Sequence, residues 1–353
     1  MIARANEDGS LVITDPSDAG TIYGKGYFGT LTEVGLSLDP YESVYLVEMS
    51  RLDAASAAGR SLDWTTLFRR ASRHHSEFGI RYVVYRDLRQ RGYVVRASPP
   101  PVAFAVLPRG GILHKTPAKF WVQPYSERFP FRLSELVDLA QRAQGAKKNL
   151  LLALVDEESD LTYYRVRRPA PSGALPPATR GSKAVGWLTA DRVVVFETAA
   201  VEGLGASLAY GSRIGRRLEL SLLEAAYLTE AGVLELRDVR THRKVPVERV
   251  VSRARKVDSR FDERLAAYRA LRARHLVVKT GFKYGAHFRA YPRNPEHSHA
   301  RYLVQAVPAD HVASWPDVAG GVRVAQGVRK EFLLGGVSDD GSVGFLSLER
   351  IRP

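Results

Sequence analysis

An internal repeat constrains the fold of this chain more than any other feature. The segment L-D-P-Y-E-S-V-Y-L at 38–46 matches L-S-L-L-E-A-A-Y-L at 220–228, and two further pairs of segments match at nearly the same spacing. The equivalent positions, separated by 182 or 183 residues, are Tyr45 with Tyr227, Tyr85 with Tyr268, and Lys148 with Lys330. This constancy predicts two copies of one structural unit within the 353 residues.

A stretch rich in proline, alanine and glycine runs from Arg168 to Lys183, between the two copies. Such a composition is typical of a connection and not of a helix or strand interior. The sequence therefore predicts an N-terminal repeat over residues 1–168, a linker over 169–183 and a C-terminal repeat over 184–353.

Each copy is predicted to mix helices with strands, because apolar residues recur at helical spacing between short apolar runs. The predicted helices are 40–49 and 78–91 in the first copy and 222–230 and 261–274 in the second, and a further helix leads to Lys148 or to Lys330. The predicted strands are 11–14, 120–122 and 150–155, then 193–196, 302–307 and 332–337, with one more beginning at Tyr93 and at Leu276. The expected fold class is α/β (α+β), repeated in tandem.

Composition narrows the range of functions. The absence of cysteine excludes disulfides and thiolate metal sites. The sequence contains no run of about 18 apolar residues, so no transmembrane helix is expected. The first ten residues lack the apolar region of a secretory signal, so we expect a cytoplasmic protein. A net charge of +14 favours a polyanionic partner, and nucleic acid is the leading candidate.

Three motifs in the second copy point to a specific chemistry. Tyr291 ends F-R-A-Y after a glycine–aromatic run, His299 opens H-A-R-Y-L-V, and Lys330 ends V-R-K. In this order and context the motifs resemble the catalytic core of the archaeal tRNA-splicing endonucleases. The resemblance implies that Tyr291 is a general base, His299 a general acid and Lys330 a transition-state stabiliser. It also implies a restriction-endonuclease-like α/β subdomain after an N-terminal α+β subdomain in each copy.

Those residue types suit RNA cleavage without a metal or other cofactor. A 2'-hydroxyl must lose a proton, a 5'-oxygen must gain one, and a cation must stabilise the charge on the phosphate oxygens. A phenol is a weak base at its ordinary pKa of about 10, so nearby cations are needed to favour the phenolate. The expected cations are Arg293, Arg301 and Lys330.

The first copy serves as an internal control. Alignment of the motifs places Leu107 at the tyrosine position and Pro117 at the histidine position, and only Lys148 is kept. Leucine and proline cannot exchange protons, so the first copy is predicted to be structural and catalytically degenerate. This pattern resembles the homodimeric family members, in which each chain fuses a structural copy to a catalytic one.

The resemblance implies an RNA-cleaving lyase that takes part in tRNA splicing and tRNA processing. It would excise introns from precursor tRNA at bulge–helix–bulge motifs and leave 2',3'-cyclic phosphate and 5'-hydroxyl ends. Two alternatives stay open: a metal-dependent nuclease, for which the active stretch offers Glu296 and Glu331, and a non-catalytic RNA-binding scaffold. A metal pair at His297 and His299 is a minor possibility, since residues i and i+2 share one face of a strand. His287 is expected to face solvent.

Two further groups of residues are assigned by the resemblance. Arg323, seven residues before Lys330 and expected on the same helical face, would grip an extruded base of the RNA together with Arg350 or, alternatively, Arg352. An acidic turn would dock onto a basic cleft of the second chain; its members are Asp156, Glu157, Glu158 and Asp160. The alternative interpretation is that these arginines are ordinary surface residues and that the acidic turn is simply exposed to solvent.

Overall fold

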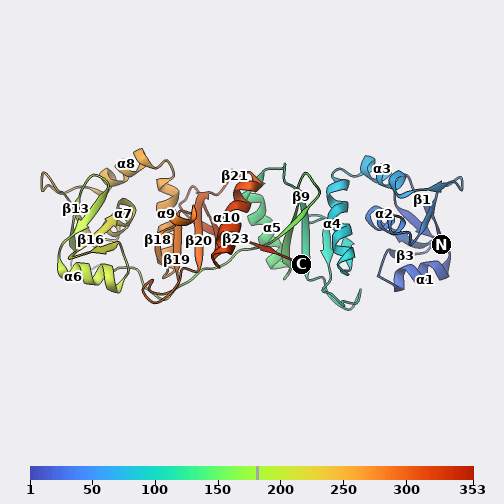
Figure 1. Ribbon diagram of the computed structural model, residues 1–353, viewed down its shortest axis with the longest axis horizontal. Coiled ribbons are helices and arrows are strands. Elements are labelled where there is room, and N and C mark those ends of the chain that lie inside the picture. The colour runs from blue at the N-terminus through green and yellow to red at the C-terminus, as the bar shows by residue number, and fades with distance from the viewer. Residues whose placement is uncertain (180–182) are drawn as a thin grey trace. The chain divides into compact units, whose positions relative to one another are not determined.

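The computed structural model describes residues 1–179 and 183–353 (Figure 1). The end of the predicted linker, Arg180 to Ser182, lies outside the described residues. Contacts divide the chain into two units, one with residues 1–129, 139–166 and 351–353 and the other with 130–138 and 167–350. The predicted linker is therefore grouped with the second copy.

The first unit begins with a six-stranded sheet of order β3-β4-β2-β1-β5-β6. Its elements, in chain order, are β1 (Ile2–Ala5), β2 (Leu11–Ile13), α1 (Pro16–Gly24), β3 (Thr30–Thr32), β4 (Gly35–Leu38), α2 (Pro40–Glu48), β5 (Asp53–Ala55), β6 (Ser61–Leu62) and α3 (Trp64–His74). A second sheet of order β12-β11-β9-β8-β7 follows. Its elements are α4 (Phe78–Gln90), β7 (Val95–Ala97), β8 (Phe104–Val106), β9 (Phe120–Ser126), α5 (Leu133–Gly145), β11 (Asn149–Val155) and β12 (Leu161–Arg167).

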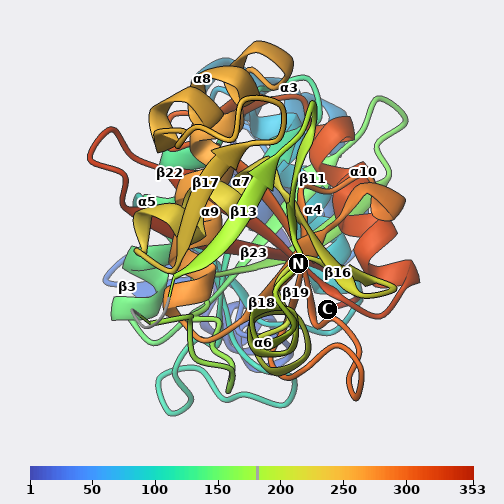
Figure 2. The same cartoon turned by 90° about the vertical axis from the view of Figure 1, so that its left-hand side faces the viewer.

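The second unit repeats this order. Its five-stranded sheet, β15-β16-β14-β13-β17, is followed by a sheet of order β18-β19-β20-β22-β23. The first sheet contains β13 (Ala184–Leu188), β14 (Arg192–Val195), β15 (Ser212–Ile214), β16 (Arg217–Ser221) and β17 (Leu234–Asp238), with α6 (Thr198–Ala200), the π-helix η1 (Val201–Ser207), α7 (Leu222–Glu230) and α8 (Val247–Val257) (Figure 2). The second contains α9 (Phe261–Ala273), β18 (Val277–Thr280), η2 (Phe282–Tyr284), β19 (Phe288–Tyr291), β20 (Tyr302–Pro308), α10 (Trp315–Gly327), β22 (Glu331–Val337) and β23 (Val343–Ile351). A short pair, β10 (Phe131–Arg132) with β21 (Val312–Ala313), completes this unit.

The tandem α/β repeat predicted from the sequence is confirmed. The first matched segment forms a capped helix in both copies, because Asp39 begins α2 and Ser221 begins α7. Each of these side chains accepts from the backbone three residues later, where Glu42 or Glu224 bonds back in a capping box. The helices α1, α3 and α8 were not predicted, although α3 and α8 bury apolar residues four apart, Leu67 with Ala71 and Val250 with Ala254.

Helices cover both faces of the second copy's sheet β18–β23. Leu333 belongs to the core that α9 forms with the sheet, through Tyr268 and Leu271. Its neighbour Phe332 packs instead against Gly321 of α10. Because successive strand residues point to opposite faces, α9 and α10 lie on opposite sides of the sheet. Because helices cover both faces of this sheet, its loops and polar side chains are concentrated at the ends of the strands.

Two sequence-based placements are wrong. The helix α10 ends at Gly327, so Lys330 lies three residues beyond it and directly before β22. Arg323 and Lys330 therefore do not share a helical face. His297 and His299 lie in the loop before β20, which begins only at Tyr302, so the period-2 strand argument for a metal pair fails as well.

Within the described residues, no helix combines the length and apolar character that crossing a membrane requires.

Candidate active site

Three chain segments of the second copy meet at one end of its sheet. Tyr291 is the last residue of β19, and the N–H of Arg301 donates to the carbonyl of Ala290 at 3.0 Å, just ahead of β20. The N–H of Glu331 donates to the carbonyl of Arg301 at 2.9 Å where β22 begins alongside β20. The end of β19 and the starts of β20 and β22 thus carry Tyr291, the His299 loop and Lys330. Backbone pairing brings the three predicted catalytic positions to the same edge.

Tyr291 is largely buried, with 7% of its surface exposed. Its ring packs with Val277 and Ala300, while it also lines a cavity of about 790 Å³. The guanidinium of Arg289 lies 5.8 Å from the ring centroid. The cations named from the sequence were Arg293, Arg301 and Lys330, so Arg289 was missed. The sequence could have indicated Arg289, because it lies two residues before Tyr291 and residues i and i+2 of a strand share a face.

His299 is exposed, and its loop is shaped by Asn294. The carbonyl of Asn294 accepts from the hydroxyl of Ser298 at 2.9 Å and from the N–H of His297 at 3.1 Å. Its side-chain amide donates to the carbonyl of Ala206 at 3.3 Å, which fastens the loop to η1. Sequence reasoning did not single out Asn294, although asparagine is a frequent turn residue for this reason.

Lys330 follows a strained backbone position. Arg329 has a φ of 55°, in the left-handed region where a helix end normally places glycine. This turn lets the N–H of Lys330 donate back to the carbonyl of Ala325 at 2.8 Å. The Lys330 ammonium donates to the carbonyl of Val328 at 3.3 Å and keeps donors to spare.

A cavity of about 340 Å³ adjoins Lys330. Its charged lining residues are Arg167, Arg301, Arg329, Lys330, Glu331 and Glu349. Both carboxylates lie near Arg167, at 3.1 Å for Glu331 and 3.7 Å for Glu349. Among the described residues, Arg301, Arg329 and Lys330 form no ion pair. The cavity therefore carries an excess of positive charge and suits an anionic group such as a phosphate.

The first copy reproduces this backbone without the proton-exchanging side chains. The N–H of Lys119 donates to Val106 at 2.9 Å, and the N–H of Asn149 donates to Lys119 at 3.0 Å. Buried Leu107 follows β8 as Tyr291 ends β19. The ammonium of Lys148 donates to the carbonyl of Ala118 at 2.7 Å. The same strand ends are thus kept while the acid–base groups are absent from these positions.

His287 does not face solvent, in contrast to the expectation from the sequence. The N–H of Ala306 donates to its Nδ1 at 3.1 Å, and its Nε2 lies 3.3 Å from the Gln305 amide. Burial lowers the pKa of His287 to about 4, and the charge of Arg264 adds to the effect. A ring nitrogen that accepts from the backbone requires the neutral form. His287 is therefore a structural residue that holds β19 to β20.

The large cavity beside Tyr291 has a mixed charge. Its cations include Arg192, Arg264, Lys279 and Arg289, and its carboxylates include Asp191, Glu219 and Glu224. Lys279 is partly buried and donates to the carbonyl of Gly211, and burial lowers its pKa. Glu219 accepts from both Arg192 and Arg217, and Arg264 pairs with Asp258, which leaves Lys279 and Arg289 as the cations of this cavity without an ion pair among the described residues.

Gln326 joins α10 to the backbone of Arg350. Arg323 is exposed on α10, and Gln326 lies one turn further along the same face. The Gln326 amide donates to the backbone carbonyl of Arg350 at 2.7 Å. Arg352 is grouped with the other unit. The hydrogen bond to Gln326 therefore brings the backbone of Arg350 to α10.

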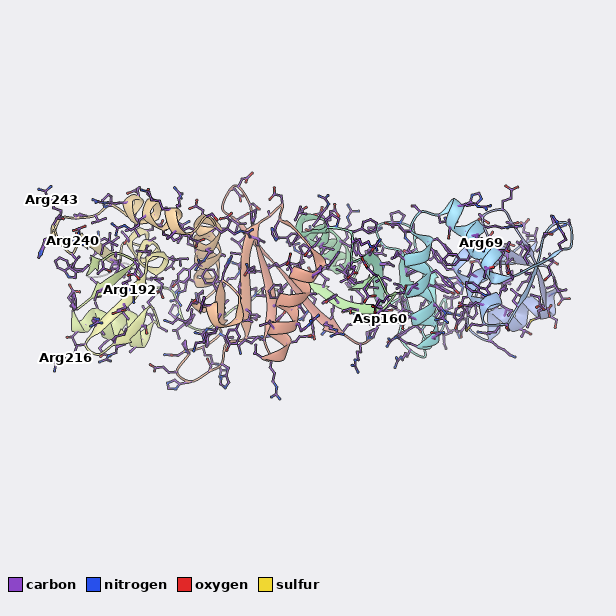
Figure 3. All side chains as sticks on the ribbon, turned by 45° about the horizontal axis from the view of Figure 1, so that its top comes forward. Arg69, Asp160, Arg192, Arg216, Arg240 and Arg243 are labelled. Carbon is purple, nitrogen blue, oxygen red and sulfur yellow. The ribbon has the colours of Figure 1, made fainter. Side chains whose placement is uncertain are left out.

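The acidic turn joins β11 to β12. One oxygen of Asp156 accepts from the N–H of Glu158 at 3.0 Å and from that of Asp160 at 2.8 Å. Glu157 accepts from Arg128 at 3.0 Å. Asp156 is therefore committed to the turn itself. Among the described residues the carboxylates of Glu158 and of Asp160, which is labelled in Figure 3, have no side-chain partner.

Within the described residues, no group of three or more histidine, aspartate or glutamate side chains could hold one metal ion.

Three exposed arginines lie far from the proposed site. They are Arg216, Arg240 and Arg243, and Figure 3 shows them at the outer edge of the second copy's first subdomain. Among the described residues none of these three forms an ion pair, so they add to the polyanion-binding character that the net charge indicates.

Comparisons with known proteins agree with the repeat. The family model described as "tRNA intron endonuclease, N-terminal domain" matches residues 4–68 and 184–251. The model described as "tRNA intron endonuclease, catalytic C-terminal domain" matches residues 78–163 and 261–345. Each model therefore finds its domain once in each copy.

Full-length relatives were also found. The chain is 36% identical to a tRNA-splicing endonuclease of Methanosarcina acetivorans over 349 residues, which cover 98% of both chains. It is 34% identical to those of Methanococcoides burtonii, over 97% of both chains, and of Natronomonas pharaonis, over 97% of this chain and 98% of that one. The family suggested by the sequence motifs is thereby confirmed.

Proposed function

The chain belongs to the tRNA intron endonuclease family, and on that premise we propose that it excises introns from precursor tRNA at bulge–helix–bulge motifs. The observation that carries the proposal is the convergence of Tyr291, the His299 loop and Lys330 at one sheet edge, beside a cavity rich in unpaired cations. A cytoplasmic place of action accords with a tRNA substrate.

The proposed reaction is a transfer of the phosphate to the neighbouring 2'-oxygen. Tyr291, as phenolate, takes the 2'-hydroxyl proton, and His299, protonated, gives a proton to the departing 5'-oxygen. Lys330 stabilises the charge that builds on the non-bridging oxygens. The products are a 2',3'-cyclic phosphate and a 5'-hydroxyl, and the reaction needs no metal or other cofactor. Arg289 adds positive charge beside Tyr291, because its guanidinium lies 5.8 Å from the centroid of the ring.

Arg323 and Arg350 are the proposed grip on an extruded base. A guanidinium plane stacks on a base or binds a phosphate, and each stacked base contributes about 1–3 kcal/mol. The Gln326 bridge supports this pairing by placing the Arg350 backbone beside the face that carries Arg323. Arg323→Ala should slow cleavage of a bulged substrate. Equal cleavage by the variant and the wild type would leave Arg323 as a surface charge.

Assembly is proposed to be a homodimer with two active sites for two splice junctions. The acidic turn Asp156, Glu157, Glu158 and Asp160 would dock onto the partner's cavity beside Tyr291, where Lys279 and Arg289 offer opposite charge. Replacement of the four acids by amides should weaken the dimer and reduce cleavage together, as seen by sedimentation and cleavage at several salt concentrations. A fully dimeric and fully active variant would show that the turn has no docking role.

The deciding experiment is cleavage of an intron-containing precursor tRNA in excess EDTA, with analysis of the product ends. Cleavage that leaves a cyclic phosphate supports the proposal. Cleavage that needs an added divalent metal would favour a metal-dependent nuclease, and binding without cleavage under any condition would favour an RNA-binding scaffold. A Tyr291→Phe, His299→Ala double variant is the matched control for a contaminating nuclease.

A further inference from the structure

The linker between the copies is hydrogen-bonded to the catalytic half. The N–H of Gly173 donates to the carbonyl of Arg274 at 2.9 Å, and the N–H of Leu175 donates to that of His275 at 3.0 Å. Between them, the N–H of Ala174 donates to the carbonyl of Pro292 at 2.8 Å. Pro292 directly follows Tyr291. One short linker segment therefore joins the turn after α9 to the residue next to the proposed base.

The linker backbone lies so close to the neighbouring backbone that only glycine fits at position 173. A Cβ on Gly173 would stand 2.3 Å from the carbonyl oxygen of His275 and 3.0 Å from that of Pro292. These atoms belong to the backbone, so they cannot swing aside as a flexible side chain could. Gly173 thus allows two backbone segments to approach the linker from the turn after α9 and from the loop after β19.

Side chains extend the same contact. Leu175 packs on the cluster formed by Ala209, Val277, Tyr291 and Ala300. Further along, the N–H of Ala178 donates to the hydroxyl of Tyr210 at 3.1 Å, and Tyr210 in turn contacts buried Arg272. The linker therefore supports Tyr291 in two ways, through the backbone beyond it and through the apolar packing around its ring.

We propose that the segment 173–175 is a positioning element for Tyr291, which fixes where the phenol oxygen lies relative to the RNA 2'-hydroxyl. This inference rests on the proposed role of Tyr291 as the base. A base must come within hydrogen-bond reach of the proton it removes, and a misplacement of about 1 Å costs on the order of 10²-fold in rate. The linker is then part of the active-site structure as well as a connection between two copies.

Ala174 offers a matched pair of variants in the full-length protein. Ala174→Pro removes the N–H that bonds Pro292, whereas Ala174→Ser keeps it, and the side chain of Ala174 is exposed in either case. We expect Ala174→Pro to lower the single-turnover cleavage rate by roughly 10- to 100-fold while the Kd for precursor tRNA stays within about twofold. Ala174→Ser should behave as wild type. Equal rates for the two variants would overturn the proposal.

A double-mutant cycle separates positioning from general damage. In a Tyr291→Phe background, Ala174→Pro should cost little further rate, because the group it misplaces is already gone. A full additional loss in that background would overturn the positioning role. Leu175→Ala provides a second entry to the cycle and should follow the same pattern if Ala174→Pro folds poorly. A wild-type rate for Tyr291→Phe alone would instead refute the base assignment, and the linker proposal with it.

Discussion

The two copies share a backbone and differ in what the backbone carries. Both place a β-strand end, a loop and a lysine at the same sheet edge, and both put a basic residue in the left-handed region before that lysine, Lys147 or Arg329. Only the second copy has Tyr291 and His299 there. The difference shows that strand register alone brings these backbone positions together, whereas only the second copy places proton-exchanging side chains on them.

A second difference lies in the buried acid of each copy. Glu42 pairs with Arg96 at 2.9 Å, and both bond to Gly29. The equivalent Glu224 bonds to Gly211, whose carbonyl accepts from Lys279, and among the described residues no ion pair joins Lys279 to Glu224. In the first copy an ion pair thus joins these residues directly, while in the second copy Lys279 lines a cavity beside Tyr291.

The largest expected effect is on the cleavage rate, which should depend on the second copy's side chains and not on those at the equivalent positions of the first copy. His299→Ala and Tyr291→Phe should each lower single-turnover cleavage by about 10²–10⁴-fold, the usual scale for a positioned acid or base. Pro117→Ala, the change at the position equivalent to His299, should leave the rate unchanged because nothing there exchanges a proton. RNA binding should be nearly the same for all three. A wild-type-like rate for either of the first two would remove that residue from the mechanism.

The buried acids should respond unequally to loss of their cations. Burial raises the pKa of Glu42 and the Asp39 charge adds to this, whereas Arg96 opposes it. Arg96→Ala leaves a buried carboxylate without its partner and should cost about 3 kcal/mol in the free energy of unfolding. Lys279→Ala removes a bond to a carbonyl and should cost about 1–2 kcal/mol. Denaturant unfolding of both variants tests this, and equal losses would contradict the difference drawn between the copies.

A smaller, pH-dependent effect should belong to the catalytic copy. The folded-state pKa of His287 is about 4 against an ordinary value near 6.5, so its contribution to stability is complete above pH 6.5 and is lost as the pH falls toward 4. The first copy has Ala103 at this position, bonded to Gln123 as His287 is to Gln305. His287→Ala therefore exchanges one copy's residue for the other's.

Between pH 7 and pH 5 the wild-type Tm should fall by roughly 2–4 °C more than that of His287→Ala, which allows for the partial exposure of the ring. Other titrating groups are common to both proteins and cancel in the comparison. Identical falls in Tm would show that the protonation of His287 is not coupled to folding.

The smallest effect concerns the left-handed turn shared by both copies. Lys147→Gly should raise the free energy of unfolding by about 0.5–1 kcal/mol, because glycine adopts positive φ without strain, and cleavage should not change. Arg329→Gly should stabilise by a similar amount yet weaken RNA binding, since it removes a cation from the cavity beside Lys330. If neither variant gains stability, the turn is not strained.

Many of the helices, strands and site positions could be predicted from the sequence, because each pattern occurs twice, once in each copy. The helix 222–230 was predicted at its observed bounds, and the internal alignment placed Leu107 where the structure has it. The end of α10 was misjudged, because a left-handed arginine breaks a helix without the glycine that usually marks the break. His287 and Asn294 were undervalued because their roles come from backbone partners, which no side-chain pattern reveals.

The linker contacts also set an order of events during synthesis. Ala174 bonds Pro292, which lies 118 residues later in the chain. At about 5–20 residues per second, the linker leaves the ribosome roughly 6–24 seconds before its partner exists outside it. The first copy, in which β9 pairs with β8 and β11 pairs with β9 and β12, has that interval in which to begin folding. The linker can take its final place only after β19 has formed, so the surroundings of Tyr291 are completed only during synthesis of the second copy.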